Sequence, residues 1–183
     1  MPTRRRLLAA TFAATAALTG GAANAVADTP PPGDIPDSQA FVTFSGHGYS
    51  LKTPEGWGRT VNGSVVTFAD KFNFVRIEAR KSATKPTVTS VRQRDVPALK
   101  AGVKGFALRS VTQVVRPAGV AILITYRAAS APDSVTGKSI TEDVERYVYW
   151  KAGRVATVTL AAPKGSDNVD AWKLITTSFQ WKR

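Results

Sequence analysis

The sequence predicts an α+β domain in which an antiparallel sheet is flanked by helices. Short apolar or alternating segments recur between residues 41 and 161, and turn residues separate them. Two other segments, around residues 88–99 and 166–177, carry apolar residues at helical spacing. The 183 residues include no cysteine and are 43% hydrophobic. This composition indicates one packed domain and excludes disulfides, thiol catalysis and cysteine-bound metals.

The N-terminal segment has the pattern of a cleavable, bacterial-type signal peptide. Three arginines at positions 4–6 precede an uncharged apolar stretch over residues 7–18, and residues 23–25 and 25–27 both read Ala-x-Ala. The stretch has about a dozen residues, whereas a membrane-spanning helix needs roughly 20. We therefore expect residues 1–27 to be removed on export and the mature protein to be secreted, with no transmembrane span. The arginines fit both a twin-arginine and a general secretory signal.

Residues 28–39 form the expected linker between the signal and the domain over residues 40–183. Four prolines and three aspartates lie in this segment, and proline both lacks an N–H donor and fixes φ, so neither a helix nor a paired strand is expected. The removed signal contains three of the 25 basic residues and none of the 13 acidic ones. The remaining charge, about +9, favours anionic partners.

The first part of the domain reads as five short strands. We expect them over residues 41–44, 49–52, 59–61, 64–69 and 74–81. Proline and glycine in the segment 53–56 suit a turn after the second strand, and Asn62-Gly63 is a strong hairpin signal. In the fifth segment, apolar Val75, Ile77 and Ala79 alternate with charged residues, as in a half-buried strand.

The helical segment that follows is interrupted by a proline. Thr87 or Thr89 is expected to cap it. Pro97 is expected either to kink the helix or to begin a second short helix that Asp95 caps. Two glycines, Gly102 and Gly105, end the region.

Long strands and a final helix complete the predicted domain. The strands are expected over residues 108–116, 120–129, 140–150 and 154–161. The continuous apolar run at 120–124 predicts a central strand that is covered on both faces. Ser166 or Asp167 is expected to cap the final helix, and residues 179–181 are expected to pair as an edge strand.

Residues 48–57, Gly-Tyr-Ser-Leu-Lys-Thr-Pro-Glu-Gly-Trp, resemble the opening motif of the PsbP/Mog1-like superfamily. The order of expected elements over about residues 41–181 is also similar to that group. The resemblance implies an α/β/α sandwich around a central antiparallel sheet, and a secreted actinobacterial-type member. It also implies action by binding, as in the extrinsic subunit of photosystem II and a Ran-binding nuclear factor. The chain lacks the acylated cysteine of the related envelope lipoproteins, so membrane tethering does not carry over.

Aromatic residues on one predicted strand are the candidate ligand-binding residues. Tyr147 and Tyr149 alternate there with Arg146, Val148 and Trp150, and such a strand is expected to expose at least one aromatic face. Rings with a polar tip often line binding surfaces. The candidate ligand-binding residues are Tyr147, Tyr149 and Trp150.

Basic residues form a second candidate surface. Arg76 and Arg80 are expected to share a strand face because alternate residues of a strand point the same way. The candidate basic patch consists of Arg76, Arg80, Lys81 and Lys85. No base-stacking motif or nucleic-acid-binding module accompanies it, so nucleic acid is not the expected partner.

No coherent catalytic set is visible, and no cofactor or metal site is expected. His47 is the only histidine and lies between two glycines in a predicted turn. The acidic residues Asp133, Glu142, Asp143 and Glu145 match no known cation-binding loop and are expected at a solvated strand end.

These observations favour a secreted, non-enzymatic binding or accessory protein of the cell envelope or extracellular space. Two alternatives remain open at this stage. One is a secreted hydrolase that uses His47 with a nearby serine or carboxylate. The other is a charge-driven binder of polyanions, such as anionic lipid, teichoic acid or nucleic acid.

Overall fold

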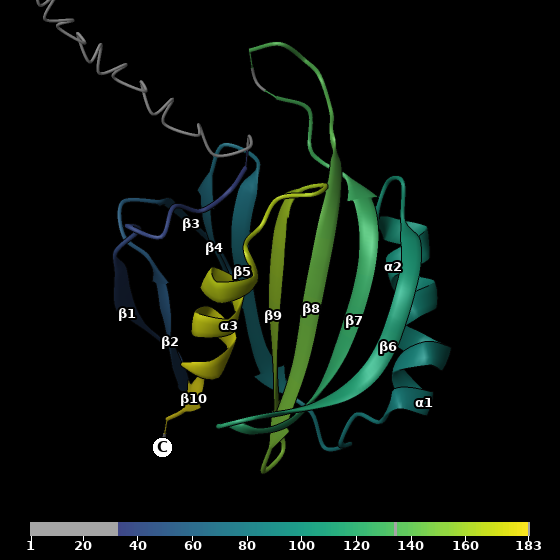
Figure 1. The fold of residues 1–183 in the computed structure, drawn as a ribbon. Helices are drawn as coiled ribbons and strands as arrows, with labels where there is room; N and C mark the ends of the chain where they lie inside the picture. Colours follow the sequence, from purple (N-terminus) through teal and green to yellow (C-terminus); the bar gives the residue numbers. More distant parts are fainter. Residues whose placement is uncertain (1–32, 134, 183) are drawn as a thin grey trace, which may run out of the picture.

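A seven-stranded antiparallel sheet dominates the computed structural model, which describes residues 33–133 and 135–182 (Figure 1). Its strand order is β3-β4-β5-β9-β8-β7-β6. The strands are β3 (Gly58–Asn62), β4 (Val65–Asp70), β5 (Asn73–Lys81), β6 (Ala107–Arg116), β7 (Gly119–Ala129), β8 (Thr141–Lys151) and β9 (Arg154–Pro163). All lie within a few residues of their predicted positions. The hairpin at Asn62-Gly63 is confirmed, since Asn62 pairs with Val65.

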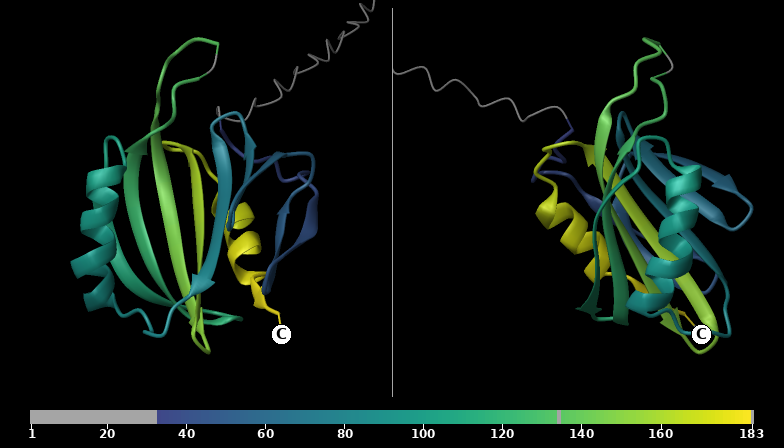
Figure 2. Two further views of the ribbon diagram at one scale, coloured as in Figure 1. Left: turned by 180° about the vertical axis from the view of Figure 1, so that it is seen from behind. Right: turned by 90° about the vertical axis from the view of Figure 1, so that its right-hand side faces the viewer.

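A second, three-stranded sheet and a helix cover one face of the large sheet. The small sheet has the order β1-β2-β10 and consists of β1 (Phe41–Gly46), β2 (Tyr49–Pro54) and β10 (Gln180–Trp181). Helix α3 (Val169–Thr177) lies beside it (Figure 1). The other face carries a helical segment made of α1 (Val88–Ser90), the π-helix η1 (Val91–Asp95) and α2 (Val96–Gly102), on the side opposite α3 (Figure 2). One outer layer thus mixes strands with a single short helix, so the structure is mostly antiparallel sheet rather than a sheet between two helical layers.

A π-turn explains how the helical segment tolerates Pro97. Thr87 caps α1, and its side chain accepts a hydrogen bond from the backbone N–H of Ser90. The N–H of Val96 donates to the carbonyl of Val91, five residues back. This wider turn precedes Pro97, which occupies the first turn of α2, where a missing N–H costs little. Asp95 makes no side-chain capping bond, so the predicted Asp95 cap is wrong.

Strand β9 occupies the middle of the large sheet, whereas β7 lies next to the edge strand β6. The prediction of a central position for β7 is therefore wrong. Its apolar run is still buried on both faces at Ala121, Ile122 and Ile124. The run thus indicates that both faces are covered, but it does not indicate how far the strand lies from the edge of the sheet.

Asn168, rather than Ser166 or Asp167, immediately precedes α3. Its side chain makes no capping bond and instead joins the start of the described chain to the domain. Its Oδ1 accepts a hydrogen bond from the N–H of Ile35 (2.6 Å), and its Nδ2 donates to the carbonyl of Gly33 (3.0 Å). Residues 33–35, which the sequence analysis assigned to a linker, therefore pack against the domain.

The signal peptide expected over residues 1–27 lies outside the described residues. Among the helices of residues 33–133 and 135–182, none combines the length and the apolar character that crossing a membrane requires.

Candidate functional site

The two faces of the large sheet differ in how completely they are covered. Val75 and Ile77 of β5 face the small sheet and α3, in a core that also contains Tyr149 and Phe179. Arg76 and Arg80 project from the other face of the same strand. The α1–α2 segment covers that face over β6 and β7, while strands β8 and β9 lie beyond it without a helix over them (Figure 2).

Two cavities occupy this uncovered part, and we call them together the sheet-face groove. The first, of about 300 Å³, is lined by residues that include Arg76, Ser130 and Glu142. The second, of about 370 Å³, is lined by residues that include Arg146 and Thr157. Arg76 and Arg146 are cross-strand neighbours on either side of Thr159. One lining residue of each cavity thus lies in the same row of the sheet.

Arg146 lies at the floor of the groove with little support from the protein. One of its guanidinium nitrogens donates to Thr159 Oγ1 (3.0 Å). In the described part of the chain, ion pairs within 4.0 Å join only Arg109 and Arg127 to Asp143. Burial lowers the pKa of Arg146, and the charges of Tyr126, Glu78 and Asp95 partly oppose that shift. A desolvated guanidinium with five N–H donors and one protein acceptor is suited to bind an anion.

Glu142 lines the same space, and Tyr126 lies near it on the same face of the sheet, with its ring packed against Phe106 (centroids 5.0 Å apart). Glu142 is 5% exposed and lines the first cavity, and burial raises the pKa of its carboxyl to about 7. Tyr126 is 4% exposed, and burial raises the pKa of its hydroxyl. Within residues 33–133 and 135–182, neither side chain has a hydrogen-bond partner. Buried polar groups in folded proteins are usually paired, so partners from solvent or a ligand are expected here.

Charged residues also line the walls of the groove. Arg80 and Glu78 come from β5, and Arg94 and Asp95 come from η1. The lining is thus mixed in charge, and its basic residues outnumber the acidic residues Glu78, Asp95 and Glu142. Such a surface suits a small polar ligand that carries a carboxylate or phosphate for Arg146. Glu142 and Tyr126 would then meet hydroxyl or amine groups of that ligand.

The predicted aromatic binding surface is buried. Tyr147 is 3% exposed and Tyr149 is 1% exposed. The Tyr149 hydroxyl donates to the carbonyl of Thr176 (3.0 Å), and the Tyr147 hydroxyl donates to Glu145 Oε2 (2.7 Å). The expectation of an exposed aromatic face is therefore wrong for Tyr147 and Tyr149, because α3 and the small sheet cover these rings, whereas Trp150 is half-buried and its role in binding stays a prediction. Trp150, on the groove face of β8, donates its indole N–H to the carbonyl of Ser82 (2.9 Å).

The structure divides the predicted basic patch. Arg76 and Arg80 do share a strand face and both line the groove. Lys81 projects from the opposite face of β5 into another cavity, and Lys85 lies exposed in the loop before α1. Whether any of the four binds a ligand is still a prediction.

The acidic strand end is less solvated than expected. Asp143 is half-buried and forms an ion pair with Arg127 (3.1 Å). Glu145 accepts the hydroxyl of Tyr147, and Glu142 is buried. In the described residues, no group of three or more histidine, cysteine or acidic side chains is placed to hold a metal ion.

His47 is exposed in the turn between β1 and β2, and among the described residues it has no hydrogen bond or ion pair. The cavity beside it is lined by the cations Arg80, Lys81 and Arg154, without a serine or carboxylate. The arrangement that a histidine-dependent hydrolase requires is therefore not found around this side chain.

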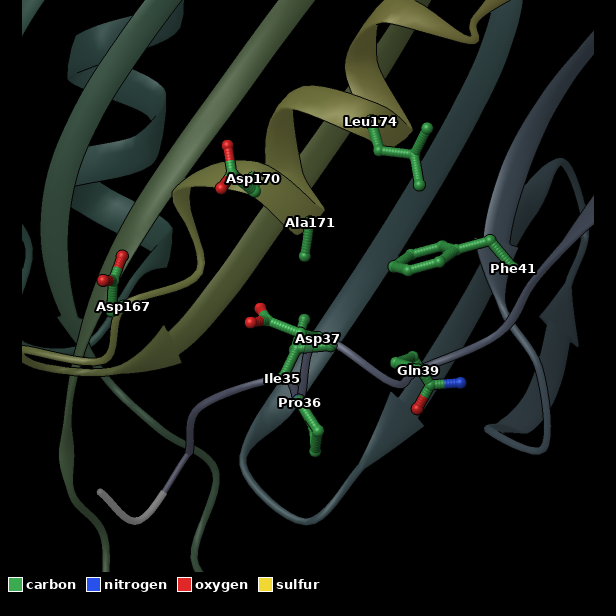
Figure 3. Close-up of a pocket in the computed structure, with 9 residues that line it drawn as sticks. All are labelled: Ile35, Pro36, Asp37, Gln39, Phe41, Asp167, Asp170, Ala171 and Leu174. Carbon is green, nitrogen blue, oxygen red and sulfur yellow. The ribbon is translucent and has the colours of Figure 1, made fainter. Parts of the chain in front are cut away.

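A further cavity, of about 250 Å³, lies between the start of the described chain and α3 (Figure 3). Its apolar side chains, Phe41 and Leu174, approach each other across it, and Asp37 lies at its rim. Asp170 is turned away from Phe41, so the acidic groups do not converge on one point (Figure 3). We therefore favour the sheet-face groove as the candidate site.

Tyr126, Glu142 and Arg146 were not among the predicted site residues. A signal for Arg146 was present, since it stands between Val144 and Val148, with Trp150 two residues further on the same strand face. A charge flanked in this way by apolar residues marks a cation placed at a largely buried position.

Solved structures with a similar fold were found by comparison. The cyanobacterial PsbP protein CyanoP from Synechocystis sp. PCC 6803 is 17% identical, with 79% of this chain and 94% of that chain covered and a TM-score of 0.56. LpqN of Mycobacterium tuberculosis, described as involved in cell envelope biogenesis, is 18% identical over 79% and 91% of the two chains, with a TM-score of 0.43. A protein from Bacteroides thetaiotaomicron VPI-5482 is 15% identical over 74% of this chain and 45% of that one, with a TM-score of 0.46; this chain thus spans less than half of that protein. Neither a family model nor a curated protein matches. On the similarity to CyanoP, the chain has a PsbP-like fold.

Proposed function

We propose that this is an exported, non-enzymatic binding or accessory protein of the cell envelope or extracellular space, and that the sheet-face groove holds its ligand. One observation carries the proposal. Two largely buried charged side chains, Glu142 and Arg146, line the groove and have between them a single hydrogen bond, from Arg146 to Thr159, and Tyr126 lies close by on the same face of the sheet. The fold alone does not indicate which activity the protein has, because proteins with similar folds have unrelated functions.

The chemistry of these groups defines the class of ligand. Arg146 is suited to bind a carboxylate or phosphate, since a guanidinium binds such groups through two parallel hydrogen bonds. Glu142 and Tyr126 are suited to bind a hydroxyl or amine of the ligand, because their oxygens can accept as well as donate hydrogen bonds. A small polar molecule with both kinds of group would contact residues of both cavities.

Binding can be tested by thermal unfolding of the purified protein against a panel of small hydroxy acids, amino acids and phosphate esters. At least one class is expected to raise the melting temperature in a saturable way. Arg146→Gln should abolish the increase, whereas Arg59→Gln, which changes an exposed arginine of β3, should leave it intact. Equal loss in both variants, with a steep salt dependence, would instead indicate charge-driven binding. No saturable ligand at all would contradict the groove as a binding site.

Export has its own test. Cells that express the full chain should accumulate a protein in the envelope or medium whose N-terminus follows Ala25 or Ala27. N-terminal sequencing of that protein measures the cleavage site. A cytosolic protein with an intact N-terminus would contradict the export proposal while leaving the binding proposal open to its separate test.

A further inference from the structure

Another cavity, of about 380 Å³, lies where the β1–β2 turn, the end of β5, the start of β9 and β10 meet. Its volume falls within the range of small-ligand sites, roughly 300–1,000 Å³. The residues that line it are His47, Gly48, Ala79, Arg80, Lys81, Arg154 and Trp181. We call it the Arg154 cavity. Apart from Arg80, these residues are absent from the groove lining.

Arg154 is held in place by two contacts, and a neighbouring glycine leaves it room. Its Nη2 donates to the carbonyl of Lys182 (3.0 Å), and its guanidinium carbon lies 5.2 Å from the centroid of the Trp181 ring. A Cβ at residue 48 would approach its Nη1 to 2.8 Å, so Gly48, with φ of +82°, leaves the room that the guanidinium occupies. The protein thus positions a charged group that has no carboxylate within 4.0 Å in the described part of the chain.

The Arg154 cavity has an excess of positive charge. Arg80, Lys81 and Arg154 contribute three permanent cations, and His47 stands beside them, while no acidic residue belongs to the lining. Cations gathered in this way repel one another unless a counter-ion is bound. Such a pocket raises the local concentration of anions.

Trp181 adds an unsatisfied donor. Its indole N–H is buried and has no acceptor among the described residues. An unpaired buried donor lowers stability, and Trp181 itself lines the cavity. A ligand rich in oxygen atoms would offer acceptors to the three cations beside it.

We propose that the Arg154 cavity binds the phosphate group of a phosphorylated small molecule or lipid headgroup. A phosphate dianion matches the excess of cations better than a single carboxylate, and its oxygens can accept from donors on several sides. This site is additional to the sheet-face groove and uses different positioned groups. Its occupancy therefore does not depend on the function proposed for the groove.

Tryptophan fluorescence and calorimetry of the purified protein, titrated with glycerol phosphate, test the proposal. Saturable binding is expected, with a change in fluorescence that Trp181→Phe removes while calorimetric binding persists. The double variant Lys81→Gln/Arg154→Gln should weaken binding at least tenfold. Its matched control, Lys100→Gln/Lys104→Gln, removes the same charge from the exposed surface beyond the cavity and should change affinity less than twofold.

Single variants keep the test decisive if the double variant fails to fold. Lys81→Gln should weaken binding about three- to tenfold relative to Lys100→Gln, because Lys81 lines the cavity and makes no structural hydrogen bond among the described residues. Because the groove is also proposed to accept phosphate esters, Arg146→Gln, which should lose binding in the groove, serves as the background: binding that persists in this variant and that Lys81→Gln weakens belongs to the Arg154 cavity. Equal losses in the cavity variants and their controls, or no saturable binding, would overturn the proposal.

Vesicles distinguish the two sources of phosphate. If the natural ligand is a headgroup, vesicles of phosphatidic acid mixed with phosphatidylcholine should bind the protein, and Lys81→Gln should weaken that binding more than Lys100→Gln. If it is a soluble phosphate ester, glycerol phosphate binds but the two variants bind vesicles equally. Both results support a phosphate site. The proposal is contradicted if glycerol phosphate does not bind and if Lys81→Gln and Lys100→Gln weaken vesicle binding equally.

Discussion

The two faces of the large sheet carry similar residue types that are used in different ways. On the closed face, the Tyr149 hydroxyl is bonded to the carbonyl of Thr176, and its ring lies 4.5 Å from that of Phe179. On the open face, Tyr126 is buried to nearly the same extent but its hydroxyl has no partner in the described residues. The comparison separates polar groups that complete the fold from polar groups that remain available for a ligand.

The same contrast holds for the charged groups. Glu145, on the closed face of β8, accepts the hydroxyl of Tyr147, and this bond and burial together raise the pKa of Tyr147 to about 12. Glu142, three residues earlier on the open face, has no such bond, and burial raises the pKa of its carboxyl to about 7. Retaining an unpaired buried carboxyl lowers stability, which is typical of functional sites.

Truncation of the closed face should have the largest effect. Phe179 is fully buried and stacks between Tyr49 and Tyr149, so Phe179→Ala should reduce the free energy of unfolding by about 3–5 kcal/mol. Arg76→Ala on the open face should change it by less than about 0.5 kcal/mol. Urea unfolding measures both values. Similar losses in the two variants would show that the faces do not differ as proposed.

Glu142→Gln should stabilise the protein at pH 8 by about 1–3 kcal/mol. Below pH 4.5, the carboxyl is protonated in both the folded and the unfolded states and contributes no difference. As the pH rises from 4.5 to about 7, the unfolded carboxyl ionises before the folded one, so the free energy of unfolding of the natural protein falls. Glu142→Gln removes this fall.

Unfolding curves at pH 4 and pH 8 check this prediction. Glu145→Gln is the matched control, and it should not stabilise the protein at pH 8 because Glu145 accepts a hydrogen bond. A pH-independent effect of Glu142→Gln would contradict the raised pKa.

The smallest effect is expected from the two tyrosine hydroxyls. Tyr149→Phe should cost about 1 kcal/mol because it leaves the carbonyl of Thr176 without its donor. Tyr126→Phe should cost less than about 0.5 kcal/mol, since no protein group loses a partner. Equal costs in guanidinium unfolding would indicate that Tyr126 has a structural bond after all.

The order of strands and helices was largely predictable, because local patterns determine it. Alternation in β5 and the Asn62-Gly63 turn are properties of a few adjacent residues. The central position of β9 was not predictable in this way, since strand order depends on pairing between distant segments, such as β5 with β9. The cap at Thr87 was among the residues expected, whereas Asn168 was missed because its side chain serves Ile35, far away in sequence.

The candidate site was predictable only in part. Arg76 and Arg80 were placed on one strand face correctly, because the period of a strand is local. Tyr147 and Tyr149 were expected at a surface, but burial depends on what packs over the strand, here α3 and the small sheet. Tyr126 and Glu142 gave no sign of their role, since their lack of partners appears only when the whole face is assembled.

The most direct test of the difference between the faces is the free energy of unfolding of Arg146→Met, measured with and without a ligand of the groove. We expect the variant to be as stable as the natural protein or more stable, because an apolar side chain of similar length replaces an unpaired buried charge. We also expect the stabilisation by the ligand to disappear. The account would be contradicted if Arg146→Met lowered the free energy of unfolding by about 2 kcal/mol or more, as truncation of a structural core residue does, and if the ligand still stabilised the variant.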